Sequence, residues 1–425
     1  MLTLNDIRES KEKIAERLTK RGWSAERSAI LDEVIGLDNQ RKETQTQLDG
    51  LLNQIKTISK EIGQLYKSGK AQEAEDSKSK VAEIKEQSSG LEQKQKELLT
   101  SIEDRLLQIP NVPHESVPPG ATEDDNEVYK AWESELPVLP DTAKPHWELA
   151  SQYNLIDFEL GTKIAGSGFP LYRGKGARLQ RALINFFLNE AIEAGYEEVM
   201  PPLLVNADTA RATGQLPDKE GQMYYMPKDD LYLIPTAEVP VTNIYRNVIL
   251  SESELPIKLT GHTPCFRREA GSYGSDVKGL NRVHQFDKIE IVQVSHPDQS
   301  YEVLYQMMDH VSGLLDKLEL PYRILRLCGG DLGFTSALTY DFEVYSAAQK
   351  KWLEVSSVSN FETYQTNRLK LRYKDANGKK QLAHTLNGSA LALARIVAAL
   401  LENHQIDGGI KIPAALVPYT GFDKI

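Results

Sequence analysis

Hydrophobic residues recur at helical spacing through the first hundred residues. Thr3 and Asp6 form a capping-box pattern at the start of the first helical run. After a break at Gly22-Trp23, Ser24 is expected to cap a much longer helix. The apolar positions alternate spacings of three and four, and they are Leu37, Leu48, Leu51, Ile55, Ile58, Ile62 and Leu65, then Val81, Ile84, Leu91, Leu98 and Ile102.

A glycine-containing turn divides this pattern into two runs of similar length. The turn is Lys67-Ser68-Gly69-Lys70. Two such runs predict an antiparallel coiled-coil hairpin over about residues 26–106. With roughly 40 residues a leg and a rise of 1.5 Å each, it would extend about 60 Å. Because so thin an arm cannot enclose a reaction site, we expect it to bind a partner.

The pattern changes after residue 110. Prolines and an acidic run mark a linker over 111–140, namely Pro110, Pro113, Pro118, Pro119 and Glu123-Asp124-Asp125. Beyond it, short β-branched and aromatic runs predict strands at Tyr196–Val205, Leu231–Ile234, Lys258–Glu269, His284–Ser295, Tyr322–Leu327, Tyr340–Tyr345 and Trp352–Phe361. Helical patterns occur at Ala177–Ala194 and Ser300–Leu318. Strands often follow one another without room for a crossover helix, which favours an α+β domain over 141–425 with a mixed, largely antiparallel sheet flanked by helices.

One pair of predicted strands concentrates charged residues on a single face. Alternation places Arg267 and Glu269 together on the first strand. It places Phe286, Lys288 and Glu290 together on the second strand. Such a set is costly to bury without a charged ligand, and ATP with an amino acid would use all of it. A solvated hairpin with surface salt bridges is the alternative for any of these residues taken alone.

No familiar nucleotide-binding loop accompanies this pair. The chain has neither a Gly-x-x-x-x-Gly-Lys-Ser/Thr sequence nor a Gly-x-Gly-x-x-Gly sequence after a strand. His284 and His384 lie beside the motifs, and structural hydrogen bonding is the favoured role for both. Cys265 and Cys328 are expected to be small buried hydrophobes.

The strand pair resembles the second signature motif of class II aminoacyl-tRNA synthetases. It reads Cys-Phe-Arg-Arg-Glu from 265, a glycine-bearing loop from 271 to 281, and Arg-Val-His-Gln-Phe from 282. Thr236-Ala237-Glu238 and the run His-Thr-Leu-Asn-Gly-Ser over 384–389 resemble seryl-tRNA synthetases of the bacterial type. Tyr196–Val205, with Pro202, is similar to the first class motif, which in the family builds a dimer interface. Ser389–Arg395 is similar to the third.

The resemblance implies a function and a site, residue by residue. The implied activity is activation of L-serine by ATP to seryl-adenylate and transfer of serine to tRNA(Ser), and to tRNA(Sec) where it is present. The implied catalytic residues are Arg267, Glu269 and Arg395. The implied ATP-binding residues are Arg267, Arg268, Glu269, Arg282, Val283, Phe286, Glu354, Val355, Ser356, Ser357 and Arg395. The implied serine-binding residues are Thr236, Ala237, Glu238, Arg267, Glu290, Asn387 and Ser389.

A magnesium site carries one structural difficulty. The resemblance implies that Glu354 and Ser357 hold Mg²⁺ together with ATP, and it implies no permanent cofactor. A spacing of three puts two residues on opposite faces of a regular strand. Either a β-bulge near Val355-Ser356 is present or one assignment is wrong.

Composition and charge add limits. The net charge of −11 argues weakly against extensive coverage by nucleic acid, but a local basic patch is compatible with it. Two cysteines exclude a disulfide framework and suit a reducing cytoplasm. The chain shows no signal-peptide pattern at its first residues and no apolar run of about 20 residues, so we expect no membrane partner.

The expected RNA partner would meet the hairpin. Lysines gather toward its tip, and they are Lys56, Lys60, Lys67, Lys70, Lys78 and Lys80. A solvated coiled-coil face would show the same charges. The resemblance implies instead that the arm binds the long variable arm of serine tRNAs through backbone and shape, in a homodimer.

Three alternatives stay open from the sequence. One is a sister class II enzyme for another small amino acid. A second is a non-catalytic synthetase-like protein that binds tRNA, although Arg267, Glu269 and Arg395 are all present. A third is a relative that loads an amino acid onto a carrier protein, which the arm argues against.

Overall fold

The chain folds as two compact units in a computed structural model that describes residues 1–139, 142–218, 220–269 and 278–425. The first unit holds Met1–Thr19 and Trp23–Pro110. The second unit holds Lys20–Gly22 and Asn111–Ile425. Within the described ranges, no helix combines the length and apolar character needed to cross a bilayer.

The first unit opens with the expected capping box. Thr3 caps α1 (Leu4–Leu18), and its hydroxyl accepts from the Asp6 backbone while the Asp6 carboxylate accepts from Thr3. The expectation for Ser24 was wrong in extent. Ser24 caps only the four-residue helix α2 (Ala25–Ser28), because the long helix starts separately at Ile30.

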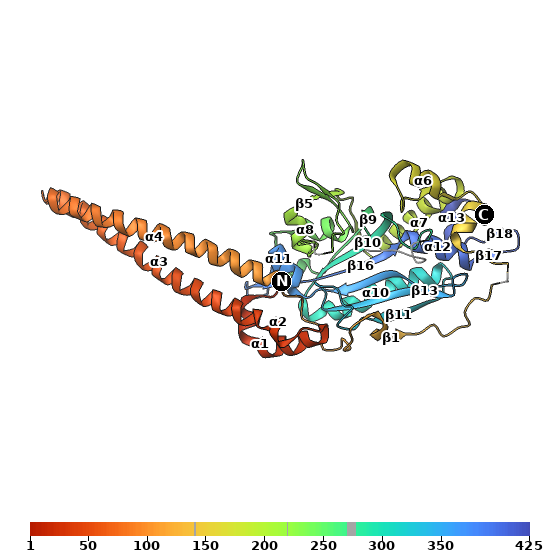
Figure 1. The fold of residues 1–425 in the computed structure, drawn as a ribbon, viewed down its shortest axis with the longest axis horizontal. Coiled ribbons are helices and arrows are strands. Elements are labelled where there is room, and N and C mark those ends of the chain that lie inside the picture. The colour runs from red at the N-terminus through yellow and green to blue at the C-terminus, as the bar shows by residue number, and fades with distance from the viewer. Residues whose placement is uncertain (140–141, 219, 270–277) are drawn as a thin grey trace. The chain divides into compact units, whose positions relative to one another are not determined.

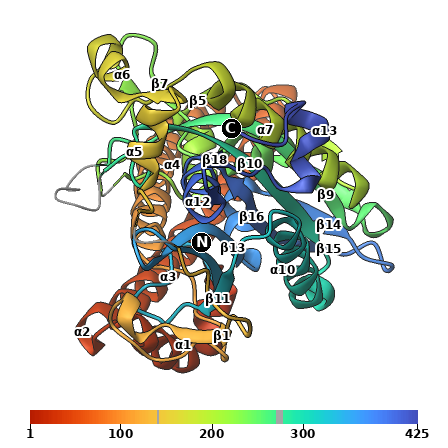
Figure 2. The ribbon, with the colours of Figure 1, turned by 90° about the vertical axis from the view of Figure 1, so that its right-hand side faces the viewer.

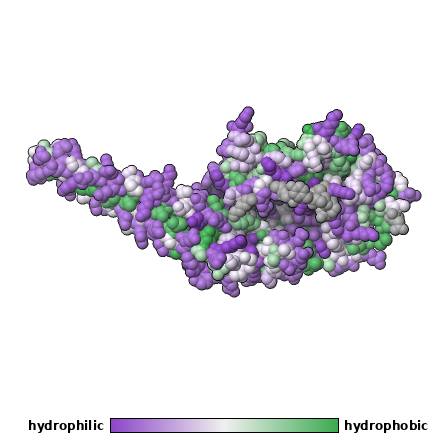
Figure 3. All heavy atoms as spheres, viewed as in Figure 1, coloured by the Kyte–Doolittle hydropathy of each residue, from purple (hydrophilic) through white to green (hydrophobic). Residues whose placement is uncertain are grey.

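The predicted helical hairpin is confirmed. Its legs are α3 (Ile30–Lys67) and α4 (Ala71–Leu106), joined by a turn in which Gly69 has φ 74° (Figure 1). A positive φ is a conformation that glycine adopts without steric cost. Leu48, Leu98 and Ile102 are buried in the seam. Figure 3 shows mainly hydrophilic residues on the visible face of the hairpin, with short hydrophobic interruptions.

An eight-stranded sheet organises the second unit. The strand order is β1-β11-β12-β13-β16-β10-β9-β4. Every pair is antiparallel except β4 with β9, which confirms the largely antiparallel α+β prediction. The strands are β1 (Glu127–Lys130), β4 (Glu197–Glu198), β9 (Ile257–Phe266), β10 (Gln285–Ser295), β11 (Tyr322–Arg326), β12 (Leu338–Ser346), β13 (Lys351–Asn360) and β16 (His384–Ala392).

Smaller elements surround this sheet. The remaining strands are β2 (Ile156–Asp157), β3 (Leu171–Tyr172), β5 (Leu204–Asn206), β6 (Tyr225–Met226), β7 (Leu231–Leu233), β8 (Ile249–Ser251), β14 (Arg372–Lys374), β15 (Lys380–Leu382), β17 (Gln405–Ile406) and β18 (Gly409–Ile410). The helices are α5 (His146–Gln152), α6 (Phe158–Ala165), α7 (Gly174–Glu193), α8 (Ala207–Thr213), α9 (Glu238–Thr242), α10 (Ser300–Lys317), α11 (Thr363–Leu369), α12 (Leu393–Asn403) and α13 (Val417–Thr420).

Three segments differ from their sequence expectations. The run Tyr196–Val205 is not one strand, because Pro201 and Pro202 cannot donate ladder hydrogen bonds and separate β4 from β5. The strand expected to reach Glu269 ends at Phe266. The expected linker 111–140 contributes the edge strand β1, which pairs with β11.

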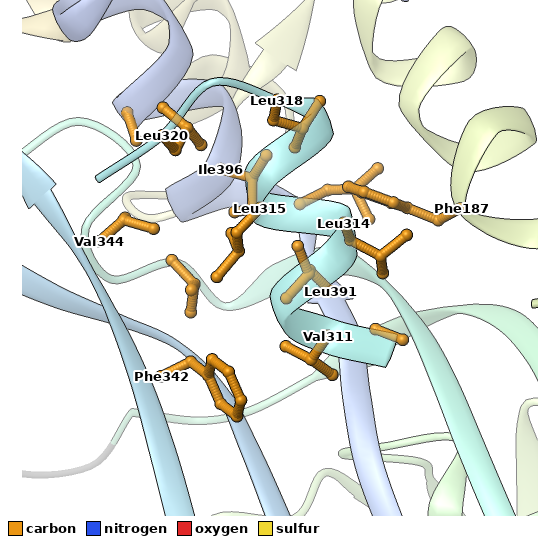
Figure 4. Packing of buried hydrophobic residues seen from close by; sticks show 14 of the residues in the cluster. Phe187, Val311, Leu314, Leu315, Leu318, Leu320, Phe342, Val344, Leu391 and Ile396 are labelled. Carbon is orange, nitrogen blue, oxygen red and sulfur yellow. The ribbon is translucent and has the colours of Figure 1, made fainter. Parts of the chain in front are cut away.

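One apolar core fixes the sheet and its helices. Side chains of α7, α10 and α12 meet there, and Figure 4 shows Phe187, Leu314 and Ile396 close together. Figure 2 shows β13, β16 and β10 side by side, as their pairing requires. Ile289 and Ile291 of β10 enter this core. Since side chains alternate along a strand, the neighbouring positions of β10 face the other side of the sheet.

Candidate active site

Lys288 and Glu290 form a buried ion pair on the second motif strand. Their Nζ and Oε2 atoms are 2.5 Å apart, and the side chains are 7% and 2% exposed. The hydroxyl of Thr236 accepts from Lys288 Nζ at 2.8 Å and donates to Glu290 Oε2 at 3.0 Å. The strand pairing sets Glu290 opposite Ser389 of β16. The structure therefore brings the predicted residues Thr236, Glu290 and Ser389 together.

A second carboxylate lies close to this pair. Glu238 begins α9 and accepts from Gln365 Nε2 at 2.7 Å. Burial and the nearby charge of Glu290 raise the pKa of Glu238 to about 7, although Gln365, Lys288 and Asn387 act in the opposite direction. Two carboxylates share one ammonium group here. An additional cation, such as the ammonium group of an amino acid, would complete the charge balance.

Arg267 adjoins Phe286 at the end of the strand pair. The guanidinium carbon lies 5.3 Å from the centre of the phenyl ring, and Nε donates to the Pro235 carbonyl at 3.3 Å. Arg267 follows the last residue of β9, so strand alternation is not what orients it. Its backbone N–H instead donates to the His284 carbonyl. A guanidinium group that is held over an aromatic ring in this way can bind a phosphate or a carboxylate group.

Glu269 and Arg282 pair with each other beside a cavity. Arg282 Nη1 donates to Glu269 Oε2 at 2.8 Å. Glu269 has φ 47°, a conformation uncommon for a residue other than glycine. Both residues line a cavity of about 280 Å³ that also touches Val283 and His284. Residues 270–277, which hold most of the predicted loop 271–281, lie outside the described residues.

The β-bulge that the magnesium assignment required is present in β13. Phe342 pairs with Ser356 while Glu343 pairs with Glu354, so Val355 is the extra residue. The bulge puts Ser357 Oγ 3.4 Å from Glu354 Oε1. Burial and the charge of Glu354 raise the pKa of Asp341, which is paired with Ser357 across the strands. Hard oxygen atoms of this kind are the ligands that Mg²⁺ prefers.

Arg395 connects the third motif to the second motif and to β13. It lies in the first turn of α12, where Nη1 donates to the Glu354 carbonyl at 2.6 Å. Its Nε donates to the Asn281 carbonyl at 3.1 Å. Arg395 therefore links the bulged strand to the residue just before Arg282.

Several implied residues have their side chains turned to other partners. Ala237, Val283 and Val355 are buried in apolar clusters, so only their backbones could meet a ligand. Ser356 donates to the Ser389 carbonyl. Arg268 lies over the Tyr224 ring at 5.7 Å.

The histidines and cysteines beside the motifs contact or pack against other parts of the protein. His284 contacts the Arg267 carbonyl and His384 contacts the Ser300 hydroxyl. Burial lowers the pKa of His384 to about 4. Cys265 and Cys328 are both buried free thiols.

Lys288 was placed on the charged strand face from the sequence but given no specific contact, and Gln365 was not singled out. Lys288 shares the strand face of Glu290, so alternation could have assigned it as the partner of that carboxylate. Gln365 gives no such signal. It comes from α11 and reaches Glu238, Thr385 and the Thr213 carbonyl only through the tertiary fold.

Comparisons with known proteins agree with this geometry. Residues 224–404 match the model of the tRNA synthetase class II core domain (G, H, P, S and T), and residues 1–113 match the seryl-tRNA synthetase N-terminal domain. The serine--tRNA ligase of Salinibacter ruber is 50% identical over 427 residues, which cover 100% of this chain and 99% of that protein.

Two solved structures extend the comparison to three dimensions. Seryl-tRNA synthetase from Pyrococcus horikoshii, complexed with ATP, is similar with a TM-score of 0.91 and 35% identity, covering 100% of this chain and 99% of that one. Cytoplasmic serine-tRNA ligase from Naegleria fowleri, in complex with AMP, gives 0.87 and 29%, covering 100% and 98%. Since relatives match over the full length and the site residues converge, the chain belongs to the seryl-tRNA synthetase family.

Proposed function

We propose that this protein activates L-serine with ATP and transfers the seryl group to tRNA(Ser), and to tRNA(Sec) where that tRNA is present. One observation carries the proposal. A buried cluster holds two carboxylates, Glu238 and Glu290, beside Lys288, and Glu290 lies on the same strand pair as the contact between Arg267 and Phe286. Family membership supports the same reaction.

Serine would enter this pocket as a zwitterion. The two carboxylates attract its ammonium group, and Arg267 receives its carboxylate. Thr236, Glu290, Asn387 and Ser389 offer polar partners to the hydroxyl. Because alanine would leave these groups unpaired, it should be rejected strongly, while threonine has to be excluded by shape.

The adenylation step requires positioning and charge stabilisation from the protein. A carboxylate oxygen of serine attacks the α-phosphorus, the bond to the bridging oxygen breaks, and pyrophosphate leaves. Arg267 neutralises the charge that develops at the α-phosphate. Arg282 and Arg395 meet the outer phosphates, and Phe286 and Glu269 hold adenine. In the structure Glu269 and Arg282 are paired with each other, so ATP has to replace that contact.

Glu354 and Ser357 would hold Mg²⁺ that arrives with ATP. Their two oxygen atoms share one side of the bulge, and this fits a hard cation whose other ligands are phosphates and water. When bound, the ion neutralises phosphate charge. The protein's own contribution is the bulge that aims both side chains the same way.

The hairpin is proposed to bind tRNA. Lys56, Lys60 and Lys67 are exposed on α3, and the other lysines near the tip are exposed as well. Lys70 and Lys78 pair with neighbouring glutamates in ion pairs that phosphate could displace. We further propose a cytoplasmic homodimer joined through the first class motif, where Met200 is 92% exposed.

Pyrophosphate exchange with a panel of amino acids tests the reaction. The purified chain, ATP, Mg²⁺ and labelled pyrophosphate should give exchange with serine alone. Signal with threonine, proline or glycine in place of serine would identify a sister enzyme. No signal with any amino acid, from protein whose circular dichroism shows it folded, would contradict enzymatic activity.

A further inference from the structure

A buried hydrogen-bond network is centred on Glu402 and reaches the residues next to Arg282. Glu402, on α12, has a fully buried side chain. Its carboxylate accepts from the backbone N–H and from Nδ1 of His146, at 2.9 and 2.7 Å. It also accepts from Gln349 Nε2 at 2.9 Å and from the Ser346 hydroxyl. A buried carboxylate that accepts four hydrogen bonds is held in one position by its neighbours.

This network ends on the three residues that precede Arg282. The N–H of Leu280 donates to His146 Nε2 at 2.8 Å. Gln349 accepts from Asn281 Nδ2 at 3.0 Å. A Cβ atom added to Gly279 would lie 2.2 Å from His146 Nε2, so the backbone of Gly279 already rests on the imidazole ring. Two of the three side chains that bond to Glu402, those of His146 and Gln349, thus reach the 279–281 segment.

The hydrogen bonds assign a charge state to the histidine. Because Nε2 accepts from Leu280, the ring proton must be on Nδ1, where it donates to Glu402. Burial alone would raise the pKa of Glu402, but the bonds from His146 and Ser346 outweigh it and hold that pKa below its usual range. An ionised carboxylate orienting one neutral tautomer is how proteins fix an imidazole.

Helix α12 connects this network to Arg395. Glu402 follows Arg395 by seven residues, which is two helical turns, so both lie on the same side of the helix. Arg395 bonds Asn281 directly, and Glu402 bonds the same segment through His146 and Gln349. Two positions of α12, Arg395 and Glu402, therefore hold the segment.

We propose that His146 and Glu402 are positioning residues for ATP, which fix 279–281 and so place Arg282 and Arg395 for the outer phosphates. This inference rests on the proposed function and deepens it. Neither residue touches the pocket of Thr236 and Glu290. Loss of the network should therefore weaken ATP binding and leave serine binding almost unchanged, which a general loss of stability would not do.

Two substitutions at one position separate the halves of the network. His146→Gln places an amide near the Nε2 position, where its oxygen can still accept from Leu280. His146→Asn places an amide near the Nδ1 position, where it can donate to Glu402 but cannot reach Leu280. His404→Gln is the matched control, because His404 follows the same helix and bonds the Leu318 carbonyl.

The measurements are ATP affinity by calorimetry and the KM values for ATP and serine in pyrophosphate exchange. We expect H146N to weaken ATP binding and raise its KM about tenfold or more, since small misplacements of binding groups are costly. The KM for serine should change less than about twofold. H146Q should lie closer to the wild type than H146N does, and H404Q should match the wild type.

Other results would overturn the inference. They are equal changes in both KM values, an H146N protein with normal ATP affinity, or an H404Q protein as impaired as H146N. Thermal unfolding of each variant keeps a folding defect separate. Absence of serine-dependent exchange in the wild type would refute the proposed function, whereas ATP calorimetry would still test the positioning role.

Discussion

The buried cluster around Glu290, which we propose binds serine, and the helical hairpin use the same residue types in opposite ways. In the pocket, Lys288 and Glu290 are almost fully buried and bonded to Thr236. In the hairpin, Lys78 and Glu75 form an ion pair of similar length in open solvent. A buried ion pair depends on both partners, whereas an exposed pair gains little because water solvates each charge. Burial therefore distinguishes charges that fix a site from charges that remain available to a partner.

The sharpest test of this comparison is removal of each lysine. Lys288→Met should destabilise the protein by about 3–5 kcal/mol, because Glu290 would remain buried without its partner. Serine-dependent exchange should fall by about a thousandfold. Lys78→Met should leave the urea unfolding midpoint and exchange unchanged. A stable and active K288M protein would show that the pocket does not need its cation.

The second test removes most of the hairpin. Deletion of Leu48–Ile102, with a short glycine linker in its place, should reduce charging of tRNA(Ser) by about a hundredfold or more, because phosphate contacts supply much of RNA affinity. Pyrophosphate exchange should stay within about twofold of the full chain, since the site lies in the second unit. Normal charging by the truncated protein would mean that the arm has another role.

The third test concerns pH. With the pKa of Glu238 near 7, the carboxylate becomes protonated as pH falls through 7 and loses its attraction for the serine ammonium group. The KM for serine should rise toward tenfold per pH unit below 7, while the KM for ATP stays flat. Glu238→Gln should have a high KM for serine that no longer varies over this range.

The same carboxylate affects stability with the opposite sign. Its pKa is raised from 4.5 in the unfolded chain to about 7 in the folded one. The folded state therefore holds the extra proton between these values. Its contribution to stability is present below about 4.5 and is lost as pH rises through 7. Urea unfolding of wild type and E238Q between pH 5 and 8 would reveal this slope.

The smallest effect is expected from one methyl group added in the hairpin, and the same change in the second unit is its contrast. Gly50 is in the interior of α3 with no heavy atom within 4 Å of an added Cβ, so Gly50→Ala should stabilise the hairpin by about 1 kcal/mol. Gly161→Ala would place its Cβ 1.8 Å from the Phe169 carbonyl oxygen and should destabilise the second unit. Hydrogen exchange of amides in α3 and α6 measures both. If both substitutions changed stability in the same direction, the difference in space around Gly50 and Gly161 would be contradicted.

The sequence by itself determined the elements whose pattern is local. The periodicity of apolar residues predicts the two legs of the hairpin and the turn at Gly69. The alternation of apolar and polar residues likewise predicts which side chains of β10 share a face with Glu290. The sequence also raised a bulge near Val355 as one of two possibilities, and the structure contains it. The motifs identified the family.

Only the tertiary structure decided which side chains meet. Gln365 reaches Glu238, and His146 reaches Glu402 and Leu280, across sequence separations of more than a hundred residues. The tertiary structure also determines that β9 ends before Arg267 and that residues 127–130 of the expected linker form a strand of the sheet. Strand ends and buried polar partners depend on which distant groups satisfy each hydrogen bond, and a local pattern holds no information about those groups.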